Sequence, residues 1–354
     1  MFSHINLRSL KLFKKSDVVI IGGGISGITS ALELKELGFK STIIEKEASI
    51  GGLSASFCCK ASESCNKCFS CVVDKKIFEI NTNKINIFTN TKPIALNGSP
   101  GQYMLTIKRG KEKLQIECSA IVIASGIEPY DATKKVEYGY GRFKNVITAK
   151  DLDEMLRKKG TIIRPSDGKI PQNVAFFQCV GSRDESIGNL YCSQVCCAYA
   201  LRLIKSLRHN YPQIMFTFLY MDIQPAGISF KKFLNSCQAD KGIRFIRSLP
   251  SKVYYSPKTE NLRVRFINPD IGDVVEEIFD MIILSVGISP GKESNQISQI
   301  FGLSFSEDGF LKEPPYEKGI FLAGACKGPK DIERSIIDAK STAFKVQNFL
   351  RGLN

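Results

Sequence analysis

One stretch near the start constrains the fold of this chain more than any other: SDVVIIGGGISGITSALELKELGFKSTIIEKE. Val18–Ile21 is a short apolar run of the kind that forms a buried parallel strand. Gly22, Gly24 and Gly27 follow it as G-x-G-x-x-G, apolar residues then recur at helical spacing, and a second apolar strand ends at Glu45. This order of strand, glycine turn, helix, strand and acid predicts a dinucleotide site in an α/β fold.

Each part of the motif has a physical reason. Gly22 permits the tight turn from strand to helix, Gly24 lets the backbone approach a pyrophosphate, and Gly27 lets the helix pack close to the strand. The pyrophosphate would meet the free amides of the helix N-terminus. Glu45 stands where a carboxylate can accept hydrogen bonds from ribose hydroxyls.

Composition limits the remaining possibilities. The chain has 354 residues and 43% hydrophobic residues, which predicts a packed globular protein of two domains. We expect a cytoplasmic protein with no membrane span and no secretory signal, because no apolar stretch is long enough for either. The net charge of +14 suits an acidic partner, such as an electron or sulfur carrier. With dispersed lysines, two histidines and no nucleic-acid motif, nucleic-acid binding is not expected.

Three further stretches carry a resemblance to the thioredoxin-reductase-like superfamily of FAD flavoproteins. They are EKEASIGGL, with Gly51 and Gly52 just after the acid, AIVIASGIEPY, and KGIFLAGACKGPKDIERSIIDAKSTA. The resemblance implies FAD as the dinucleotide. It places the FAD contacts at Gly22, Gly24, Ser26, Gly27, Glu45, Lys46, Gly52, Leu53, Ala124, Gly126, Gly324, Asp331 and Ile332.

The superfamily inserts a second nucleotide-binding domain, and here its glycine motif is missing. NVAFFQ, residues 173–178, reads as the first strand of that domain, MFTFLYMDI as the next, and a helix is expected from about Ser193 to Leu207. Between them only Gly181 and Gly188 occur, at the wrong spacing for a phosphate cradle. Cysteines stand in that place instead.

The sequence has twelve cysteines, and four of them form a C-x12-C-x3-C-C pattern at Cys179, Cys192, Cys196 and Cys197. Cys192 and Cys196 are expected on one side of a helix start. Clustered thiols in an intracellular chain indicate metal binding or redox chemistry more often than disulfides. Their chemistry leaves four interpretations open: a 4Fe–4S cluster, a zinc site, a redox dithiol, or core packing.

The block FFQCVGSRDE…YCSQVCC…GIRFIRSLPSKV, with GIEPYD, VGISPG and AGACKGPKDI, closely resembles the A subunit of heterodisulfide reductase. In that family the four matching cysteines hold a 4Fe–4S cluster beside the FAD. The resemblance implies a subunit that passes electrons between flavin and B- and C-type partner subunits in disulfide or sulfur metabolism, with a homodimeric core. Because no ferredoxin pattern occurs, the chain resembles the short, sulfur-oxidation type.

Two departures from the family affect the expected chemistry. Arg202 stands where members have a flavin-proximal lysine, and because arginine does not give up its proton we do not expect electron bifurcation. A second cysteine group adds Cys71 to a family C-x-x-C. This group, Cys58, Cys59, Cys65, Cys68 and Cys71, is compatible with a second metal or cluster site, a thiol relay with Cys65 and Cys68 as candidate catalytic thiols, or an unliganded loop. Cys118, Cys237 and Cys326 stand alone and are expected to be packing residues.

The predicted fold is therefore an α/β, thioredoxin-reductase-like, two-domain flavoprotein whose inserted, degenerate nucleotide-binding-like domain carries an iron–sulfur cluster. We place a basic arm at residues 1–16, the FAD domain at 17–150 and 269–354, and the inserted domain at 151–268. Two other functions remain in competition. One is an NAD(P)H-dependent, thioredoxin-reductase-like disulfide or ferredoxin reductase, and the other is a zinc-containing binding protein without enzymatic activity.

Overall fold

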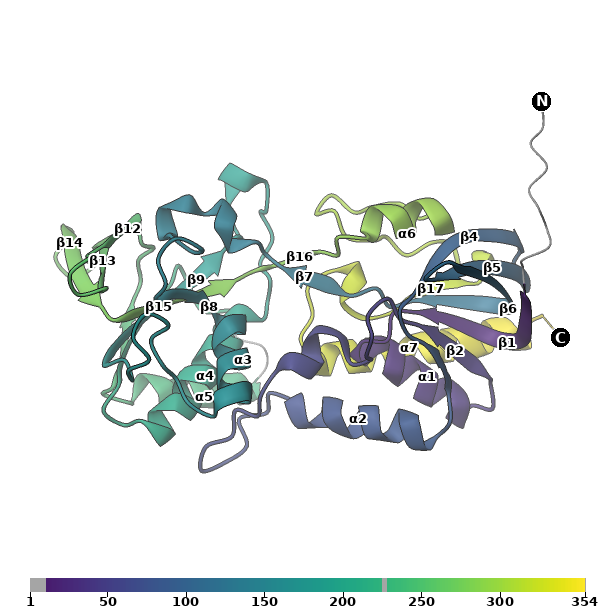
Figure 1. Ribbon diagram of the computed structural model, residues 1–354, viewed down its shortest axis with the longest axis horizontal. Helices are drawn as coiled ribbons and strands as arrows, with labels where there is room; N and C mark the ends of the chain where they lie inside the picture. Colours follow the sequence, from purple (N-terminus) through teal and green to yellow (C-terminus); the bar gives the residue numbers. More distant parts are fainter. Residues whose placement is uncertain (1–10, 225–227, 354) are drawn as a thin grey trace. The chain divides into compact units, whose positions relative to one another are not determined.

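The computed structural model describes residues 11–224 and 228–353, and the chain forms two compact units (Figure 1). Unit 1 consists of Met1–Ala55, Phe69–Glu128 and Pro290–Asn354. Unit 2 consists of Ser56–Cys68 and Pro129–Ser289. The chain passes between the units through β7 (Ile127–Pro129) and β16 (Ile288–Pro290), which pair with each other.

Unit 1 is built on a seven-stranded sheet in the order β3-β2-β1-β6-β5-β4, with β17 also paired to β6. Strands β1, β2, β3, β6 and β17 are mutually parallel, and β4–β5–β6 form an antiparallel meander. The strands are β1 (Lys11–Ile21), β2 (Ser41–Ile44), β3 (Asn86–Phe88), β4 (Thr91–Ser99), β5 (Gln102–Arg109), β6 (Glu112–Ile123) and β17 (Ile320–Leu322). The helices are α1 (Ile25–Glu36), α2 (Ser70–Thr82), α6 (Ser294–Phe301) and α7 (Ile332–Arg351).

The apolar run in β1 is explained by burial on both faces of this sheet. Val18 and Ile20 pack with α1 and α7 on one face, and Val19 and Ile21 pack with the meander and α6 on the other. All four side chains are at most 4% exposed. A strand covered on both faces can be apolar throughout, which is why the run does not alternate with polar residues.

Unit 2 is built on a five-stranded sheet in the order β11-β10-β9-β15-β8, in which every neighbouring pair is parallel. Its strands are β8 (Val146–Thr148), β9 (Asn173–Val180), β10 (Met215–Leu219), β11 (Ile243–Ile246) and β15 (Met281–Val286). A three-stranded antiparallel sheet adds β12 (Lys252–Tyr255), β13 (Leu262–Ile267) and β14 (Val274–Phe279). The helices are α3 (Ala149–Lys159), α4 (Cys196–Asn210) and α5 (Ile228–Gln238).

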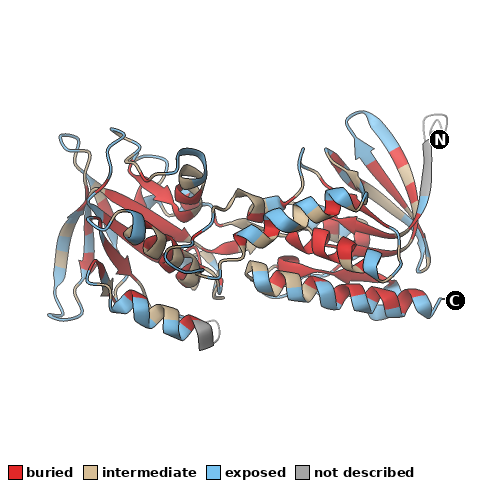
Figure 2. Cartoon of the chain, turned by 90° about the horizontal axis from the view of Figure 1, so that it is seen from below, coloured by how far each residue is buried: buried red, intermediate tan, exposed pale blue. Residues whose placement is uncertain are grey.

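The central sheet of unit 2 also has two covered faces. Phe176 of β9 packs with α3, α4 and α5, whereas its neighbour Phe177 packs with the antiparallel sheet on the opposite face. Figure 2 shows the inner strands of both central sheets mostly buried, with exposed residues on the outer sides of the helices. The predicted strands at residues 173–178 and 215–223 correspond to β9 and to the shorter β10.

The boundaries between the two units differ from the boundaries predicted at residues 150 and 268. The reason is strand pairing: β8 and β15 belong to the central sheet of unit 2, so residues 146–148 and 281–286 fold with it. The predicted arm at residues 1–16 also differs. Residues 1–10 lie outside the described residues, and Lys11–Ser16 extend β1 alongside β6.

Within the described part of the chain, no helix is both long and apolar enough to cross a membrane.

Candidate functional site

In the glycine turn after β1, backbone atoms lie close to Gly22 and Gly27, whereas space remains beside Gly24. A Cβ on Gly22 would lie 2.3 Å from Ala124 O, and one on Gly27 would lie 1.9 Å from Gly22 O. A Cβ on Gly24 would meet nothing closer than Gly52 Cα, at 4.0 Å. The protein itself therefore excludes side chains at Gly22 and Gly27, while Gly24 leaves room for a ligand to approach the backbone.

Helix α1 presents an uncompensated positive end at this turn. Gly24 is its N-cap, no side chain caps it, and its first turn has no acidic residue. The amides there remain available, and the helix dipole favours an anion. Ser26 lies against Gly324, because a Cβ on Gly324 would come within 1.9 Å of Ser26 Oγ. Two segments far apart in the sequence thus meet at the same turn.

Glu45, predicted to contact a ribose, is buried and holds the glycine turn. Its Oε2 accepts from Gly23 N at 2.6 Å, and its Oε1 accepts from Glu47 N at 2.8 Å. A carboxylate has about four acceptor positions, so these two bonds leave capacity for a hydroxyl donor. The neighbouring Lys46 forms an ion pair with Glu293 at 3.4 Å.

The other predicted FAD residues all lie in unit 1. Leu53 and Gly52 follow β2 in a short 3-10 helix, Ala124 and Gly126 follow β6, Gly324 follows β17, and Asp331 and Ile332 begin α7. Those strands are parallel, so their carboxyl ends share one edge of the sheet, where ligands bind in folds of this type. Asp331 caps α7 by accepting from Arg334 N at 2.8 Å.

Asp338 was missed by the sequence analysis. Its Oδ2 accepts from Gly324 N at 2.6 Å, and its Oδ1 pairs with Lys327 Nζ at 2.9 Å. Burial alone would lower the pKa of Lys327, but the bonds and charges of Asp338 and Glu313 together outweigh it and the pKa is raised. The signal was available in the spacing: Asp338 follows the N-cap Asp331 by seven residues, which puts both on one face of α7.

In unit 2, the four predicted cluster cysteines come from two elements and the loop that joins them. Cys179 lies in β9, Cys196 and Cys197 open α4, and Cys192 lies in the preceding loop. Cys179, Cys196 and Cys197 are at most 8% exposed, and Cys192 is half-buried. The chain bends sharply at the first of them, because Cys179 has a φ of +59°.

The expected helix start at Ser193, with Cys192 and Cys196 on one helical face, is wrong. Gln194 has a φ of +59°, which a helix cannot contain, and its backbone N donates to Cys192 Sγ at 3.3 Å. The segment is thus a turn around the Cys192 sulfur, and α4 begins only at Cys196.

The four thiols interact as one electrostatic group. Cys196 donates hydrogen bonds toward the sulfurs of Cys179 and Cys197, which lowers the pKa of Cys179 and lowers that of Cys197 to about 7. The same bonds raise the pKa of Cys196 well above its ordinary value. Burial raises the pKa of Cys192, and the charges of Cys197 and Cys179 raise it further.

Two residues beside the thiols were also missed by the sequence analysis. Arg183 pairs with Asp222, with Nη2 and Oδ2 3.1 Å apart, and its positive charge lowers the pKa of Cys179. The segment that carries Asp222 also supplies the backbone N of Gln224, which donates to Cys197. Arg183 lies four residues after Cys179, but no spacing rule marks it as a neighbour of the other thiols.

The donor set of four thiols is compatible with a 4Fe–4S cluster. Among residues 11–224 and 228–353, no group of three or more His, Cys, Asp and Glu side chains is placed to hold one ion. In a cubane each thiolate binds a different iron, so the ligand sulfurs do not have to surround a single point. Four interacting thiols are the ligand number and type that such a cluster uses.

The second cysteine group is divided between the units. Cys65 and Cys68 lie in unit 2, whereas Cys71 lies on α2 in unit 1. Cys59, Cys65 and Cys71 are exposed. Arg202, expected near the flavin, lies on α4, and its Nε donates to Asn66 O at 2.8 Å, within the C-x-x-C segment.

The remaining three cysteines are packing residues, as predicted. Cys118, Cys237 and Cys326 are at most 3% exposed and belong to apolar clusters. Burial raises the pKa of Cys118 and Cys326 to about 12 and that of Cys237 to about 11.

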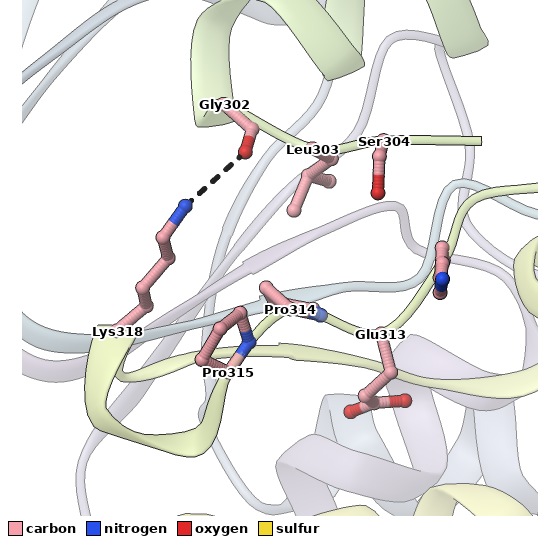
Figure 3. Close-up of a pocket in the computed structure, with 8 residues that line it drawn as sticks. Gly302, Leu303, Ser304, Glu313, Pro314, Pro315 and Lys318 are labelled. Carbon is pink, nitrogen blue, oxygen red and sulfur yellow. Dashed lines mark hydrogen bonds between the residues drawn. The ribbon is translucent and has the colours of Figure 1, made fainter.

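A hollow on unit 1 includes none of the predicted site residues, although Glu313 in its lining pairs with Lys327 at 3.3 Å. It is lined by Gly302, Leu303, Ser304, Lys312, Glu313, Pro314, Pro315 and Lys318. Figure 3 shows Lys318 reaching Gly302 O, at 3.4 Å, across its rim. It contains no cysteine and no residue of the glycine turn, so it gives no reason to move the candidate sites.

Comparison with known proteins agrees with the fold. Residues 16–164 match the Pyridine nucleotide-disulphide oxidoreductase family. The thioredoxin reductase of Lactococcus lactis in its FR conformation superposes with a TM-score of 0.62, at 17% identity, over 96% of this chain and 100% of that one. At that identity the likeness concerns the fold alone. It confirms the predicted α/β, thioredoxin-reductase-like, FAD-binding fold.

Two curated relatives match nearly the whole chain. One is the second iron-sulfur A subunit of the CoB--CoM heterodisulfide reductase of Methanopyrus kandleri, which is 31% identical over 98% of this chain. The other is the A subunit of the H(2):CoB-CoM heterodisulfide,ferredoxin reductase of Methanothermobacter thermautotrophicus, which is 32% identical over 96% of it. The match covers 66% and 64% of those relatives, so the chain spans just under two thirds of their length. The chain belongs to the family of heterodisulfide reductase A subunits, which is a family of oxidoreductases.

Proposed function

We propose that this chain is a flavin- and iron–sulfur-containing electron-transfer subunit of a heterodisulfide-reductase-like system. FAD would be held by the glycine turn of unit 1, and a 4Fe–4S cluster by Cys179, Cys192, Cys196 and Cys197 of unit 2. When bound, FAD supplies electron transfer in pairs or singly, and the cluster supplies it singly. The observation that carries the proposal is the convergence of four thiols from a strand, a loop and a helix into one interacting group.

In unit 1, the residues support binding and orientation of a dinucleotide. The unclaimed amides at the start of α1 accept a pyrophosphate, and Gly24 leaves the space for it. Glu45 fixes the turn through Gly23 N and keeps acceptor capacity for a ribose. Asp338 holds the amide of Gly324, which orients the segment after β17 toward Ser26.

In unit 2, the residues support a cluster that carries negative charge. Loading it would release the thiol protons, including those that Cys196 now shares with its neighbours. Arg183 supplies a fixed positive charge beside the sulfurs. The backbone amides of Gln194 and Gln224 donate to Cys192 and Cys197, and such bonds tune the potential of a cluster.

The names of the relatives support the proposed partners. Their names describe subunits of assemblies that act on a CoB-CoM heterodisulfide, in one case together with ferredoxin. We propose B- and C-type subunits as partners of this chain, a homodimeric core, and a disulfide or bound sulfur species as the substrate of the assembly. The net charge of +14 would favour docking of an acidic electron or sulfur carrier.

Cofactor analysis of the anaerobically purified chain tests the proposal. We expect about one FAD and about four irons with matching sulfide per chain, and no zinc. Cys197→Ala should lose most of the iron, because it removes one of four ligands. The matched control is Cys237→Ala, which removes a thiol from the apolar core and should keep the iron. FAD without iron, or equal iron in both variants, would contradict the cluster assignment.

A further inference from the structure

The segment Ser56–Cys68 has little regular structure, yet a buried charge pair holds it. Lys60 is 1% exposed and Asp153, on α3, is 0% exposed, with Lys60 Nζ and Asp153 Oδ2 2.7 Å apart. Lys60 Nζ also donates to Cys58 O at 3.0 Å, and Cys58 N donates to Asp153 Oδ1 at 2.8 Å. The backbone of Cys58 is thus hydrogen-bonded to both members of the ion pair, through its N to Asp153 and through its O to Lys60.

Aromatic residues complete this anchor. The ammonium of Lys60 lies 5.4 Å from the ring centre of Phe57 and 5.1 Å from that of Tyr199, on α4. The Tyr199 hydroxyl donates to Asp153 Oδ2 at 2.7 Å. We call Lys60, Asp153 and Tyr199 the Lys60 clamp. It joins the loop to α3 and α4 at once.

A clamp of this kind serves position more than stability. A buried ion pair is often no more stabilising than apolar residues of equal volume, but its hydrogen bonds admit a single geometry. Long ordered loops without secondary structure are also commonly functional. The residues whose position the clamp fixes are the cysteines that follow it.

A second anchor acts directly on the C-x-x-C turn. Asn66 lies between Cys65 and Cys68; its O accepts from Arg202 Nε on α4 at 2.8 Å, and its Nδ2 donates to Lys60 O at 2.8 Å. The helix that opens with two of the proposed cluster ligands therefore also holds this turn, and the turn is tied back to Lys60.

The turn itself is shaped around the Cys65 sulfur. Lys67 has a φ of +50°, and its backbone N donates to Cys65 Sγ at 3.4 Å. Cys192 and Gln194 repeat this arrangement, with a φ of +59° and an N–Sγ distance of 3.3 Å. In both turns the amide fixes the position of the sulfur. Unlike Cys192, Cys65 is exposed and can meet a partner.

The two thiols suit disulfide chemistry better than metal binding. C-x-x-C spacing is the arrangement of redox dithiols, in which one thiol attacks and the other resolves. A closed zinc or cluster site uses four ligands, whereas the C-x-x-C turn supplies two thiols.

We infer that the Cys65–Cys68 turn is a thiol–disulfide exchange site, and that Lys60 is its positioning residue. The Cys65 thiolate attacks one sulfur of a disulfide R–S–S–R′; the S–S bond breaks, and R–S⁻ leaves and takes up the proton that Cys65 gave up. Cys68 then attacks Cys65 Sγ, and R′–S⁻ leaves with the proton of Cys68. Two electrons pass to the disulfide, and the site becomes a Cys65–Cys68 disulfide. The inference goes beyond the proposed function, because this exchange requires neither flavin nor cluster.

The aromatic disulfide 5,5′-dithiobis(2-nitrobenzoate) is a suitable probe, because each exchange releases a coloured thiol. The reaction is run on the full, cofactor-loaded chain in a Cys59→Ser, Cys71→Ser background, which removes the other exposed thiols. We expect two coloured thiols per turn and a Cys65–Cys68 disulfide in the peptide map. Cys68→Ser should release one and keep the probe on Cys65. Unlabelled Cys65, or two thiols released without Cys68, would overturn the inference.

Lys60→Met tests the positioning role separately. The first release should persist, whereas release of the second thiol should slow by about tenfold or more, because resolution depends on the alignment of the two sulfurs. Lys158→Met, an exposed lysine on α3, is the control and should resolve like the parent. Tyr199→Phe keeps the ring, removes the hydroxyl's bonds to Asp153 and to Ala149 O, and should slow resolution less. Equal resolution rates in all three variants would refute the role of Lys60, and FAD and iron contents report independently on the proposed function.

Discussion

At the scale of single residues, two glycines of the turn, Gly27 and Gly24, lack a side chain for different physical reasons. Gly27 faces the backbone of Gly22 so closely that an added Cβ would lie 1.9 Å from its O. Gly24 has the ordinary φ of −75°, and an added Cβ would meet no protein atom closer than Gly52 Cα, at 4.0 Å. Glycine is thus required at position 27 because α1 packs closely against the end of β1. At position 24 the protein leaves space, so the close approach of a ligand is the reason for glycine there.

We therefore predict opposite behaviour for two alanine variants. Gly27→Ala should lower the free energy of unfolding by about 1–3 kcal/mol or more, because backbone must move to admit the Cβ. Gly24→Ala should change it by at most about 1 kcal/mol, the cost of a poorer N-cap. It should nevertheless weaken FAD binding by more than tenfold. Urea unfolding of the apoprotein and titration with FAD measure the two effects. A Gly24→Ala variant with normal FAD affinity would contradict the assignment.

The same comparison shows which residues a sequence can locate. The glycine turn is readable because its sterics are local: strand, turn and helix are consecutive. The prediction that Cys192 lies at the start of a helix was wrong because Gln194 adopts a φ of +59° and forms a turn there. Such a φ is unusual for a residue other than glycine. The contacts of Lys60 with Asp153 and of Arg202 with Asn66 join segments far apart in the chain, and no periodicity indicates them.

At the scale of elements, α4 connects the proposed cluster with the rest of unit 2. Its first residues are Cys196 and Cys197, its middle carries Tyr199 and Arg202, and near its end Arg208 binds Asp240. Arg208 Nη2 lies 3.0 Å from Asp240 Oδ1, and Asp240 Oδ1 also accepts from Gly242 N at 3.0 Å. The Arg208–Asp240 pair thus ties the end of α4 to the turn before β11.

Burial by itself would raise the pKa of Asp240, but the bonds from Arg208 and Gly242 outweigh it and hold the pKa below its ordinary 3.8. The stability that the charge contributes is therefore fully present above pH 3.8 and is lost as the pH falls through the lower, folded-state pKa. Asp240→Asn should lower the free energy of unfolding by about 1.5–3 kcal/mol at neutral pH.

That deficit should shrink in acid, since the wild-type carboxyl then loses its charge as well. Urea unfolding at about pH 7 and about pH 3 would show this. Asp270→Asn is the control: its carboxylate is exposed in the same unit, and the change should be within about 0.5 kcal/mol at either pH. A deficit of Asp240→Asn that is independent of pH would mean that the lost contact is not electrostatic.

Strands that are apolar along their whole length were predicted correctly. Strands whose assignment depends on pairing with segments far away in the sequence were not. The strand predicted at residues 173–178 corresponds to β9, because its apolar run lies between two covered faces. The boundaries at residues 150 and 268 differ from the observed ones because β8 and β15 are short. Their membership of unit 2 depends on register with β9 and with each other, which the sequence does not display.

At the scale of the whole molecule, the two units use the same architectural position in different ways. Each has a set of parallel strands in which a buried strand leads into a helix, β1 into α1 and β9 into α4. The start of α1 is uncapped, with no acid in its first turn. The start of α4 is filled by the thiols of Cys196 and Cys197, with the pKa of Cys197 lowered to about 7.

A helix N-terminus stabilises one anionic group at a time, so this difference predicts nucleotide preference. In unit 2 a pyrophosphate would compete with ionised thiols or with a cluster for the amides of α4. We therefore expect neither NADH nor NADPH to reduce the flavin of the cofactor-loaded chain at a rate of catalytic interest.

A low-potential chemical reductant, added anaerobically to the same sample, should bleach the flavin completely and serves as the positive control. Rapid bleaching by either nucleotide would show that a pyridine nucleotide site exists despite the thiols. It would favour an NAD(P)H-dependent, thioredoxin-reductase-like disulfide reductase, whose electrons enter from a nucleotide, over an electron-transfer subunit that receives them from protein partners.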